Sequence, residues 1–517
     1  MTAADCLARC LTDGRTSGSW LRCSAGAMRS GLPARRSSGI ALIVLALSPV
    51  AGQVFAAVTI SSAATQNMSC ANGVCVPTAN NAVLNVADLE TLLASGNATV
   101  TTTGSGGIQA DDIDVKAGIS WTSTGVLSFN AWRSVAVSQP IAVNGASGLS
   151  VLTNGGGAGG MLSFSSGANV SFLDLASSLS VNGAAYTLEN SIAALATAIA
   201  ANPGGNYALA NNYDASHDGT YSNSPIPTEF SGNFEGLGNT ISNLSITAPA
   251  NTNTYVGLFA EIGSGNESGG TLADIALRKL RINGQGIFVG GLVGRNDGAI
   301  SGASVEGSIQ SDNTNGSAIG CLAYTNVGSI TLSSAGCSVT SVGLASNGGL
   351  VSGNDGVITQ SYATGAVKSG ASGGAGGVVD YNQGSITESY ATGAVTAGKD
   401  SAIGTFIGHN RAASTSQTYG TGYLKATNKN PDKGGYVGDD TSPPGSIASA
   451  YWDTTTSGFA KLGRGAGNIK NDPGITGLTT TQLQAGLPAG FDPTIWAETP
   501  SINNGLPYLI ANPPEKK

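Results

Sequence analysis

The chain has 517 residues, of which 76 are glycine, 41 % are hydrophobic and only 10 % are charged. Glycine-rich, weakly charged chains are often disordered, but isoleucine and valine recur here at regular spacing, which argues for an ordered fold. The net charge is −8. No basic cluster follows the first 56 residues, so a nucleic-acid partner is disfavoured.

Residues 1–56 have the features of a leader with a signal peptide. Residues 29–36 contain arginines and no acid, Ile40–Leu47 is a short apolar run, and Val54-Phe-Ala56 offers a small-residue cleavage site. The apolar run is too short to span a membrane comfortably, and an uncleaved anchor is the alternative. We expect export, cleavage after Ala56 and a true start at Met28.

An even number of cysteines remains after the leader, as expected in an oxidising compartment. They are Cys70, Cys75, Cys321 and Cys337. Cys70 and Cys75 flank an Asn-Gly turn, and we predict a disulfide between them. Cys321 and Cys337 lie in one repeat unit, where they either form a bridge or stack as two small side chains. A metal site is the weakest interpretation, because the chain has only two histidines, and neither lies near a cysteine in the sequence.

Residues 57–185 contain short alternating runs separated by glycine and asparagine, a pattern of strands and tight turns. The runs are Ile113–Val115, Leu127–Phe129, Val135–Val137, Ile141–Val143, Leu149–Val151, Leu162–Phe164 and Val170–Phe172. We predict an irregular N-terminal β-solenoid, with a short helix at Asp88–Leu93.

Residues 186–228 are predicted to connect two solenoid sections. Apolar residues recur there at helical spacing; they are Leu188, Ile192, Leu195 and Ile199. Pro203 follows, so we expect a helical connector that ends before the proline. A strand at 206–214 would then open the second section.

Residues 229–460 contain a tandem repeat with offsets of 30, 28 and 28 residues. Its units begin at Gly290, Gly320, Gly348 and Gly376. Each unit continues with an apolar pair, an Asn-x-Gly corner and an isoleucine. The corners are Asn296–Gly298, Asn326–Gly328, Asn354–Gly356 and Asn382–Gly384. Glycine and asparagine suit tight corners, and the fixed period predicts an all-β fold, an elongated parallel β-solenoid (β-helix) whose equivalent residues stack about 4.8 Å apart.

Parts of this repeat resemble the GLUG motif (Gly-Leu-apolar-Gly) of surface and secreted bacterial proteins of the filamentous haemagglutinin type. One unit matches the motif fully, through Gly291, Leu292, Val293 and Gly294. Two later units keep the first part and lose the last glycine. Their matching residues are Gly349, Leu350 and Val351, and Gly377, Val378 and Val379.

The resemblance implies an exported, non-catalytic, adhesin-like protein of a Gram-negative bacterium, either secreted or at the cell surface (outer membrane). The implied partners are an outer-membrane translocator and a glycan or protein ligand on a host or another surface. The sequence departs from two-partner secretion systems, because it has no Asn-Pro-Asn-Gly-Ile segment near the expected mature start. We also do not expect a complete autotransporter.

Residues 461–517 are predicted to form a C-terminal cap and a polar tail. Gly477–Leu483 would start a short helix, and Ser501–Leu509 would form a closing segment. An apolar cap over the last coil is expected, because the open end of a solenoid exposes unpaired strand edges.

The sequence contains no recognisable catalytic motif. It has two histidines, no His-Glu-x-x-His and no local Ser/His/Asp signature, so histidine-based catalysis is hard to build. GLUG-type repeats also accompany certain zinc peptidases. If this chain is related to those peptidases, it holds only their non-catalytic part. We therefore expect no enzymatic activity, no cofactor and no metal.

The alternative is a carbohydrate-active parallel β-helix enzyme, a polysaccharide lyase or hydrolase, which needs clustered carboxylates. The acidic clusters are Asp111–Asp114 and Asp439–Asp440, and each is explained as a solvated corner. Tyr362 and Tyr390 recur at equivalent positions. A stacked row of aromatic rings can bind sugar or protein, but we expect a structural stack.

Overall fold

The computed structural model describes residues 57–249, 254–263, 269–426 and 432–515. The predicted leader at 1–56, with its cleavage site and the start at Met28, lies outside these residues. Within the described ranges, no helix is long and apolar enough to cross a membrane.

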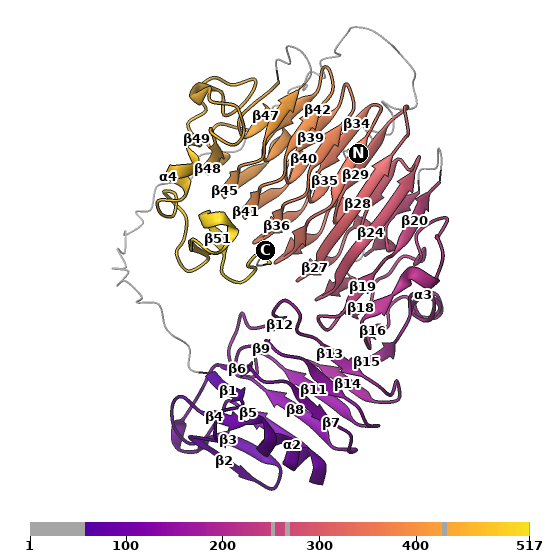
Figure 1. Ribbon diagram of the computed structural model, residues 1–517, viewed down its shortest axis with the longest axis vertical. Coiled ribbons are helices and arrows are strands. Elements are labelled where there is room, and N and C mark those ends of the chain that lie inside the picture. The colour runs from indigo at the N-terminus through magenta and orange to yellow at the C-terminus, as the bar shows by residue number, and fades with distance from the viewer. Residues whose placement is uncertain (1–56, 250–253, 264–268, 427–431, 516–517) are drawn as a thin grey trace, which may run out of the picture. The chain divides into compact units, whose positions relative to one another are not determined.

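The N-terminal section contains three stacks of short strands around one apolar core (Figure 1). The first stack is, in spatial order, β12 (Leu162–Phe164), β9 (Val135–Val137), β6 (Asp112–Val115), β1 (Ala57–Ser61) and β4 (Val83–Asn85). The second is β13 (Val170–Phe172), β10 (Ile141–Val143) and β7 (Ile119–Trp121). The third is β2 (Met68–Ala71), β3 (Val74–Pro77), β5 (Ala98–Thr101), β8 (Val126–Asn130), β11 (Gly148–Leu152), β14 (Ser178–Val181) and β15 (Ala184–Glu189).

Most strand pairs in this section are parallel. Among the described strands of this section, only β2–β3 and β14–β15 pair in the antiparallel direction. The alternating runs expected from the sequence are all strands. Leu127 pairs with Leu149, which pairs with Leu179. The first two partners are closer in sequence than the second two, so successive coils (the turns of the solenoid) differ in length.

One helix lies within this section, α2 (Val86–Ser95). It begins after Asn85, whose side chain accepts a hydrogen bond from the Ala87 amide at 2.8 Å. Leu89 and Leu93 are buried in the N-terminal core, so the helix covers part of that core. A short 3-10 turn, η1 (Ser105–Gly107), follows β5.

A second helix, α3 (Ile192–Ala201), joins the two solenoid sections and is capped by Ser191. Its buried residues follow the expected helical spacing and are Ile192, Leu195 and Ile199. Leu188 was expected in this helix, and that prediction is wrong. It lies in β15 and pairs with Ala208 of β16 (Asn206–Leu209), because pairing with the next strand overrides local spacing.

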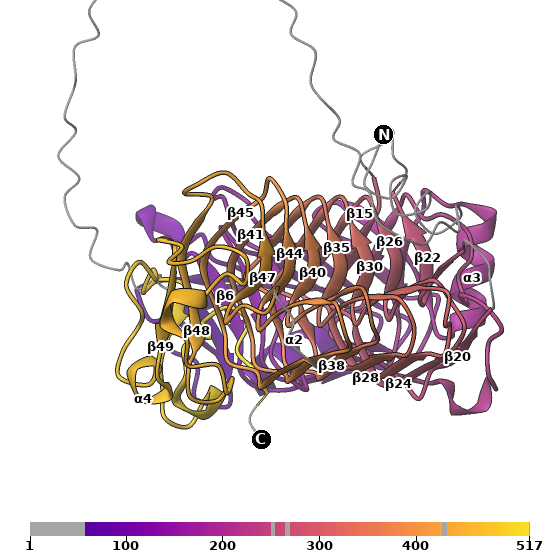
Figure 2. The ribbon, with the colours of Figure 1, turned by 90° about the horizontal axis from the view of Figure 1, so that it is seen from above.

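The C-terminal section stacks its strands in parallel on three faces. The first face is β21 (Tyr255–Val256), β25 (Phe288–Gly290), β29 (Ser317–Gly320), β34 (Ala345–Gly348), β39 (Gly374–Gly376) and β43 (Ala402–Gly404). The second is β22 (Phe259–Ile262), β26 (Val293–Asn296), β30 (Ala323–Asn326), β35 (Val351–Asn354), β40 (Val379–Asn382), β44 (Ile407–Asn410) and β47 (Val437–Asp440). Strands of this second face lie side by side in Figure 2.

The third face is longer, and each coil contributes up to three strands to it. Its first strands are β17 (Tyr213–Asp214), β18 (Asn233–Glu235), β19 (Thr240–Ser242), β20 (Ser245–Ala248), β23 (Thr271–Ala273), β24 (Ala276–Gly284), β27 (Ala299–Ser301), β28 (Ser304–Ser311), β31 (Ser329–Thr331), β32 (Ser334–Ala335) and β33 (Ser338–Ser341). It continues through β36 (Val357–Thr359), β37 (Tyr362–Ala363), β38 (Val367–Ser369), β41 (Ser385–Ala391), β42 (Val395–Ala397), β45 (Ser414–Gly420), β46 (Leu424–Ala426), β48 (Ile447–Asp453) and β49 (Ile475–Leu478).

One repeat unit of the sequence is one coil of the structure. Successive first glycines are strand partners: Gly290, Gly320, Gly348, Gly376 and Gly404. The isoleucines after the corners are partners on the third face: Ile300, Ile330, Ile358 and Ile386. The predicted all-β parallel solenoid with a short helical connector is confirmed.

The glycine before the GLUG motif is the one that the backbone requires most clearly. A Cβ atom on Gly290, Gly348 or Gly376 would lie 2.0, 1.6 or 1.8 Å from the carbonyl oxygen three residues later. No side chain fits at that distance, so each coil turns between its first and second faces at this glycine. The apolar pair that follows is fully buried at Leu292 and Val293.

The C-terminal cap packs on a side of the stack. It contains α4 (Thr480–Leu483), a hairpin of β50 (Trp496–Ala497) and β51 (Tyr508–Leu509), and the 3-10 turn η4 (Asn503–Gly505). Its apolar side chains form one cluster with the stacked tyrosines of the third face. The cluster includes Leu483, Phe491, Trp496, Leu506 and Leu509 with Tyr362, Tyr390, Tyr419 and Tyr451.

The expected cap at residues 461–517 thus has two parts. Its first part, which includes η3 (Leu462–Arg464), covers the end of the stack, and its Ala466 and Ile475 join the main core with Trp452. Its second part lies on the side of the stack, where no cap was expected. The cap packs on this side because the row of stacked tyrosines would otherwise expose a large apolar surface to water. The rings of Tyr362 and Tyr390 lie 4.8 Å apart and 8° from parallel, so the expected structural stack is confirmed.

Candidate functional site

A groove of about 680 Å³ lies between the third face and the cap. Its floor is one residue from each of five successive coils: Gly336, Thr364, Thr392, Thr421 and Asp453. Ala394, Tyr423 and Thr456 border the floor, and the opposite wall comes from Thr480, Gln484, Asn504 and Leu506. The groove therefore follows the stacking direction of the coils.

The groove is shallow at one end and deep at the other. Thr364 is exposed, Thr392 is half-buried and Thr421 is buried. Tyr423 is 52 % exposed beside the deeper half. The cap thus covers the floor progressively toward the last coils.

Asp453 closes the deep end of the groove and is itself fully buried. Its Oδ1 accepts hydrogen bonds from the amides of Thr455 and Thr456, at 2.8 and 3.1 Å. Its Oδ2 accepts one from the Thr480 hydroxyl at 2.7 Å. These donors tie the cap to the last coils, so Asp453 has a structural role.

The groove is suited to binding rather than to acid–base chemistry. Among the described residues that line it, Asp453 is the only carboxylate, and no lysine, arginine or histidine takes part. Glycoside hydrolysis usually needs two carboxyl groups across the scissile bond. We therefore assign no hydrolytic reaction to this groove.

In the acidic clusters Asp111–Asp114 and Asp439–Asp440, individual carboxylates form separate ion pairs and do not act together at one site. Asp112 pairs with Arg133 and accepts from the Ser134 amide at 2.9 Å. Asp114 pairs with Lys116 at 2.9 Å, and Asp439 pairs with Arg411 at 2.5 Å. Neither cluster lines the groove. Within the described residues, no group of three or more His, Cys, Asp or Glu side chains could hold a metal ion.

Serine, aspartate and histidine meet on the first and second faces, but in an order that does not activate the serine. Asp380 is 2 % exposed and stands between the other two. It accepts a hydrogen bond from the Ser346 hydroxyl and contacts Nδ1 of His409 at 3.1 Å. The hydroxyl thus faces the carboxylate rather than the imidazole that a nucleophilic serine needs.

The charge of Asp380 governs the neighbouring imidazole. Burial alone would lower the pKa of His409, but the charge of Asp380 and the hydrogen bond to it outweigh burial, so this pKa is raised. Asp380 occupies the last position of the GLUG motif, and glycines at 374 and 408 leave room for its carboxylate. Asp380 thus stands where the motif has a glycine, and the neighbouring glycines leave space for its larger side chain.

A pair of carboxyl groups lies in the first coils of the C-terminal section. Glu235 ends β18, and Asp274 follows β23 in the next coil. Burial raises the pKa of Glu235 to about 7. Burial and the charge of Glu235 also raise the pKa of Asp274, and the two groups share a hydrogen bond. The pair therefore holds a proton, and sequence spacing gives no signal for it.

The sequence-derived candidate residues lie in the core of the repeat, apart from the groove. Gly291 to Gly294, Gly349 to Val351 and Gly377 to Val379 form or adjoin the turn between the first and second faces. Their apolar members, Leu292, Val293, Leu350, Val351, Val378 and Val379, are all 0 % exposed. The motif builds the scaffold, whereas the groove comes from the Tyr-Ala-Thr-Gly segments two corners later.

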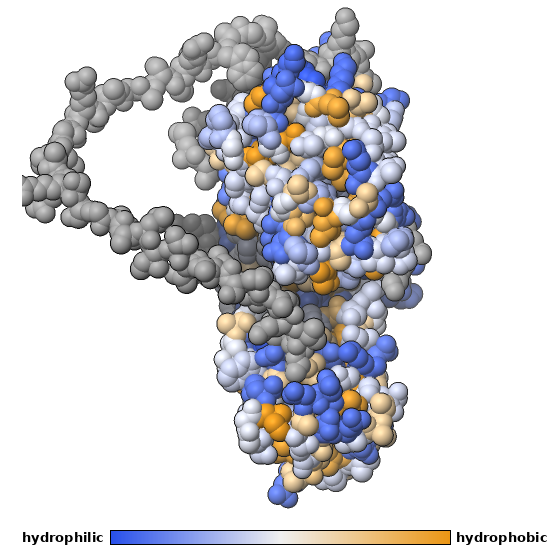
Figure 3. Space-filling view, turned by 90° about the vertical axis from the view of Figure 1, so that its left-hand side faces the viewer, coloured by the Kyte–Doolittle hydropathy of each residue, from blue (hydrophilic) through white to orange (hydrophobic). Residues whose placement is uncertain are grey.

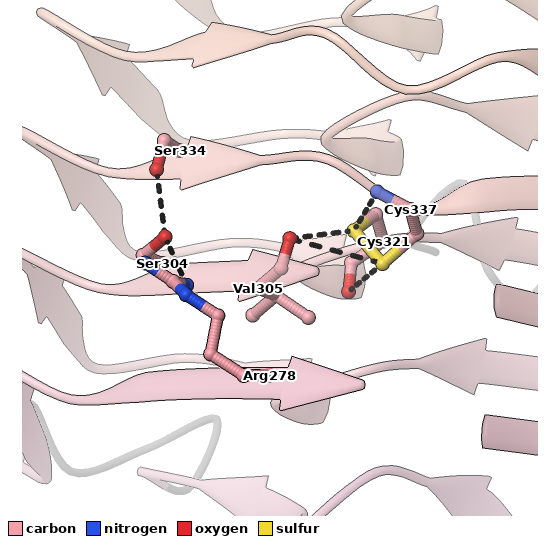
Figure 4. The surroundings of a disulfide bond; sticks show 6 residues. All are labelled: Arg278, Ser304, Val305, Cys321, Ser334 and Cys337. Atoms are coloured by element: carbon pink, nitrogen blue, oxygen red, sulfur yellow. Dashed lines mark hydrogen bonds between the residues drawn. A yellow bond between two sulfur atoms is a disulfide. The ribbon is translucent and has the colours of Figure 1, made fainter. Parts of the chain in front are cut away.

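The structure contains both candidate disulfides. Cys70 is bonded to Cys75 across the β2–β3 hairpin. Cys321 is bonded to Cys337 inside the core, where the Val305 carbonyl oxygen lies 3.4 Å from the Cys321 sulfur (Figure 4). Both Cys321 and Cys337 are fully buried, so this bridge links the two corners of one coil out of contact with solvent.

Fold and groove together define the chain as a parallel β-solenoid protein. No protein-family model matches the sequence, and no curated protein matches it. Several solved structures are similar, and two of them illustrate the likeness. One, called "IgA1 Protease", has 20 % identity and a TM-score of 0.38, covering 50 % of this chain and 20 % of that chain. The other, a proposed immunoglobulin A1 protease from Bacteroides ovatus, has 17 % identity and a TM-score of 0.41, covering 63 % of this chain and 92 % of that chain.

The present chain thus spans a fifth of the length of the first of these proteins. Both structures carry the names of proteases, which contradicts the expectation that the chain has no enzymatic activity, and that expectation is not retained. Local motifs are a poor guide here, because a solenoid can bring catalytic groups together from coils far apart in sequence. Neither likeness transfers a reaction or a substrate to this chain.

Proposed function

We propose that this protein is an exported, adhesin-like β-solenoid, secreted or displayed at the cell surface, as its resemblance to filamentous haemagglutinin-type proteins implies. The observation that carries the proposal is the repetition of small polar side chains at one position of successive coils. A row on the third face shows this: Ser301, Thr331, Thr359, Thr387 and Ser416. Such rows offer a ligand the same contact many times.

Repetition gives weak contacts a useful strength. Once one contact has formed, the next forms at a high effective concentration, so avidity exceeds the affinity of a single coil. The surface also suits contact with water and polar ligands. On the face shown in Figure 3, apolar residues form small separate patches among polar ones.

The disulfides support the exported location. Disulfides persist in oxidising compartments and are rare in the cytosol, and the described chain contains two of them. Export agrees with the leader features of the sequence. The proposed partners are an outer-membrane translocator and a glycan or protein ligand, with no nucleic acid.

Protease treatment of intact producing cells, with the culture medium assayed in parallel, tests this proposal. We expect the protein to be removed from the cells by protease, or to be found in the medium, while a periplasmic marker stays intact. If the protein resists protease until the outer membrane is permeabilised, and is absent from the medium, contact with external ligands is ruled out as its function.

A further inference from the structure

We propose that the groove between the third face and the cap binds an uncharged oligosaccharide. The inference deepens the proposed function, because it gives the adhesive surface a defined site and a ligand class. It rests on the proposed function only for its biological use. The binding itself follows from the groups that line the groove.

The groove presents hydrogen-bonding groups that the protein leaves unused. Within the described chain, the hydroxyls of Thr364, Thr392 and Thr421 make no hydrogen bond to another protein group. The Tyr423 hydroxyl and the Asn504 side-chain amide likewise have no protein partner among the described residues. Hydroxyls and amides both donate and accept, which matches the hydroxyl groups of a sugar.

The spacing of these groups favours a chain of sugar units over a small compact ligand. One residue per coil at about 4.8 Å places three threonine hydroxyls in a row about 10 Å long. Tyr423, beside this row, exposes a flat aromatic ring. Sugar rings carry hydroxyls at their edges and C–H groups on their faces, so a row of hydroxyls beside an aromatic ring contacts both. The volume of about 680 Å³ is within the usual range of ligand sites.

The opposite wall is held in place before any ligand arrives. Gln484 Nε2 donates to the Asn504 carbonyl at 2.8 Å. Thr480 is fixed by Asp453, and Leu506 is buried in the apolar cluster under the cap. A preorganised wall reduces the entropy lost on binding.

Other ligand classes fit less well. Anions lack a partner, because no cationic side chain lines the described groove. A metal ion would find one carboxylate whose oxygens already accept hydrogen bonds. A peptide that adds a β-strand needs free backbone groups, yet the floor amides of Thr392 and Thr421 donate to Ala363 and Ala391 in the preceding coils.

Calorimetric titration of the purified protein with cellotetraose, maltotetraose, mannotetraose and chitotetraose tests the proposal, with tetragalacturonate as the charged comparison. We expect at least one neutral tetrasaccharide to bind and tetragalacturonate not to bind. Thr392→Val keeps the shape and removes one hydroxyl, so affinity should fall about two- to tenfold. Tyr423→Ala removes the exposed ring and should weaken binding by at least as much.

Thr396→Val is the matched control, because Thr396 lies on the neighbouring β42 but does not line the groove. It should bind like the unaltered protein, although it loses the hydrogen bond from the Thr396 hydroxyl to the Val367 carbonyl at 3.4 Å. All three variants should keep the β-rich circular dichroism spectrum of the unaltered protein. Absence of binding to every neutral tetrasaccharide overturns the inference, as does equal binding by Thr392→Val, Tyr423→Ala and the control. The cell experiment above measures location alone, so the two proposals fail independently.

Discussion

The corner asparagines form a buried ladder of side-chain amides. In each coil Nδ2 donates to Oδ1 of the asparagine in the next coil, at 2.6, 2.7, 2.8 and 2.9 Å. The ladder runs through Asn296, Asn326, Asn354, Asn382 and Asn410, all 0 % exposed. It ends at Asp440, which accepts from Asn410 at 3.1 Å. A side chain that accepts but cannot donate, such as the Asp440 carboxylate, is tolerated only at this last position, because no further asparagine follows it in the ladder.

This direction predicts an asymmetric response to exchanging amide and acid. Asn354→Asp places a carboxylate against the Asn382 oxygen, where it can no longer donate, and should lower the free energy of unfolding by about 2–4 kcal/mol. Urea unfolding at pH 7 measures this change. Asp440→Asn keeps the accepting oxygen and should change stability by less than about 1 kcal/mol. Equal losses in the two variants would contradict a directional ladder.

Glu235 makes stability depend on pH. Its pKa is about 7 in the folded protein and 4.5 ordinarily. Between these values the folded protein holds a proton that the unfolded chain releases, so the contribution of Glu235 to stability falls as pH rises through this window. The full difference corresponds to about 3 kcal/mol. Unfolding temperatures measured from pH 4.5 to 8 should therefore decline.

Glu235→Gln isolates this group from the others that titrate. Glutamine stays neutral, so the decline between pH 4.5 and 7 should become markedly shallower than in the unaltered protein. Asp274, whose pKa burial also raises, and His409, whose pKa is raised as well, each contribute a loss of stability as pH rises through their own folded pKa, and both remain in the variant. An unchanged pH profile would show that the proton is not held at Glu235.

At the scale of elements, the turn between the first and second faces depends on the glycine before the motif. Gly348→Ala would place Cβ 1.6 Å from the Val351 carbonyl oxygen, so the backbone must shift. We expect a loss of about 3 kcal/mol or more in the free energy of unfolding. Gly353→Ala, in the same coil, meets nothing nearer than Thr325 Oγ1 at 3.6 Å and is the control. The prediction fails if both variants unfold at the same urea concentration.

The sequence predicts the coils because apolar periodicity and Asn-x-Gly corners repeat in it. It does not predict the corner after Ser301 and its equivalents, where non-glycine residues adopt left-handed backbone with φ between 46 and 52°. These are Asp274, Leu332, Gln360, Glu388, Gln417 and Ser449. The Asp274 amide donates to the Ser301 carbonyl of the next coil at 3.0 Å. Contacts between coils impose this conformation, and no local residue preference encodes it.

The groove escapes sequence analysis for a related reason. Thr364 and Thr392 are visible in the repeated Tyr-Ala-Thr-Gly segments, but their role depends on the cap, which lies more than a hundred residues from Thr364 in the chain. The GLUG motif instead marks Gly291 and its equivalents, which are buried. In a repeat protein the strongest sequence signal marks the packing, and function arises where an irregular segment meets the regular one.

At the scale of the whole molecule, the cap fastens distant coils together. The Tyr419 hydroxyl donates to the Pro507 carbonyl at 2.6 Å. The tail beyond the hairpin runs back along the third face, where Asn512 Nδ2 donates to the carbonyls of Ser333 and Gln360 at 3.3 and 3.0 Å. Glu515 pairs with Arg278 at 2.6 Å. These contacts tie several coils to one C-terminal segment, which also forms the wall of the groove.

We propose that this stack of coils makes adhesive contact outside the cell. The most direct measurement counts producing cells that stay attached, under flow, to surfaces coated with neutral glycans, and compares them with the same cells after deletion of the gene. We expect that deletion reduces attachment and that restoring the gene recovers it. Equal attachment of both cell types on every coating, with the protein shown to be at the surface, would contradict the account.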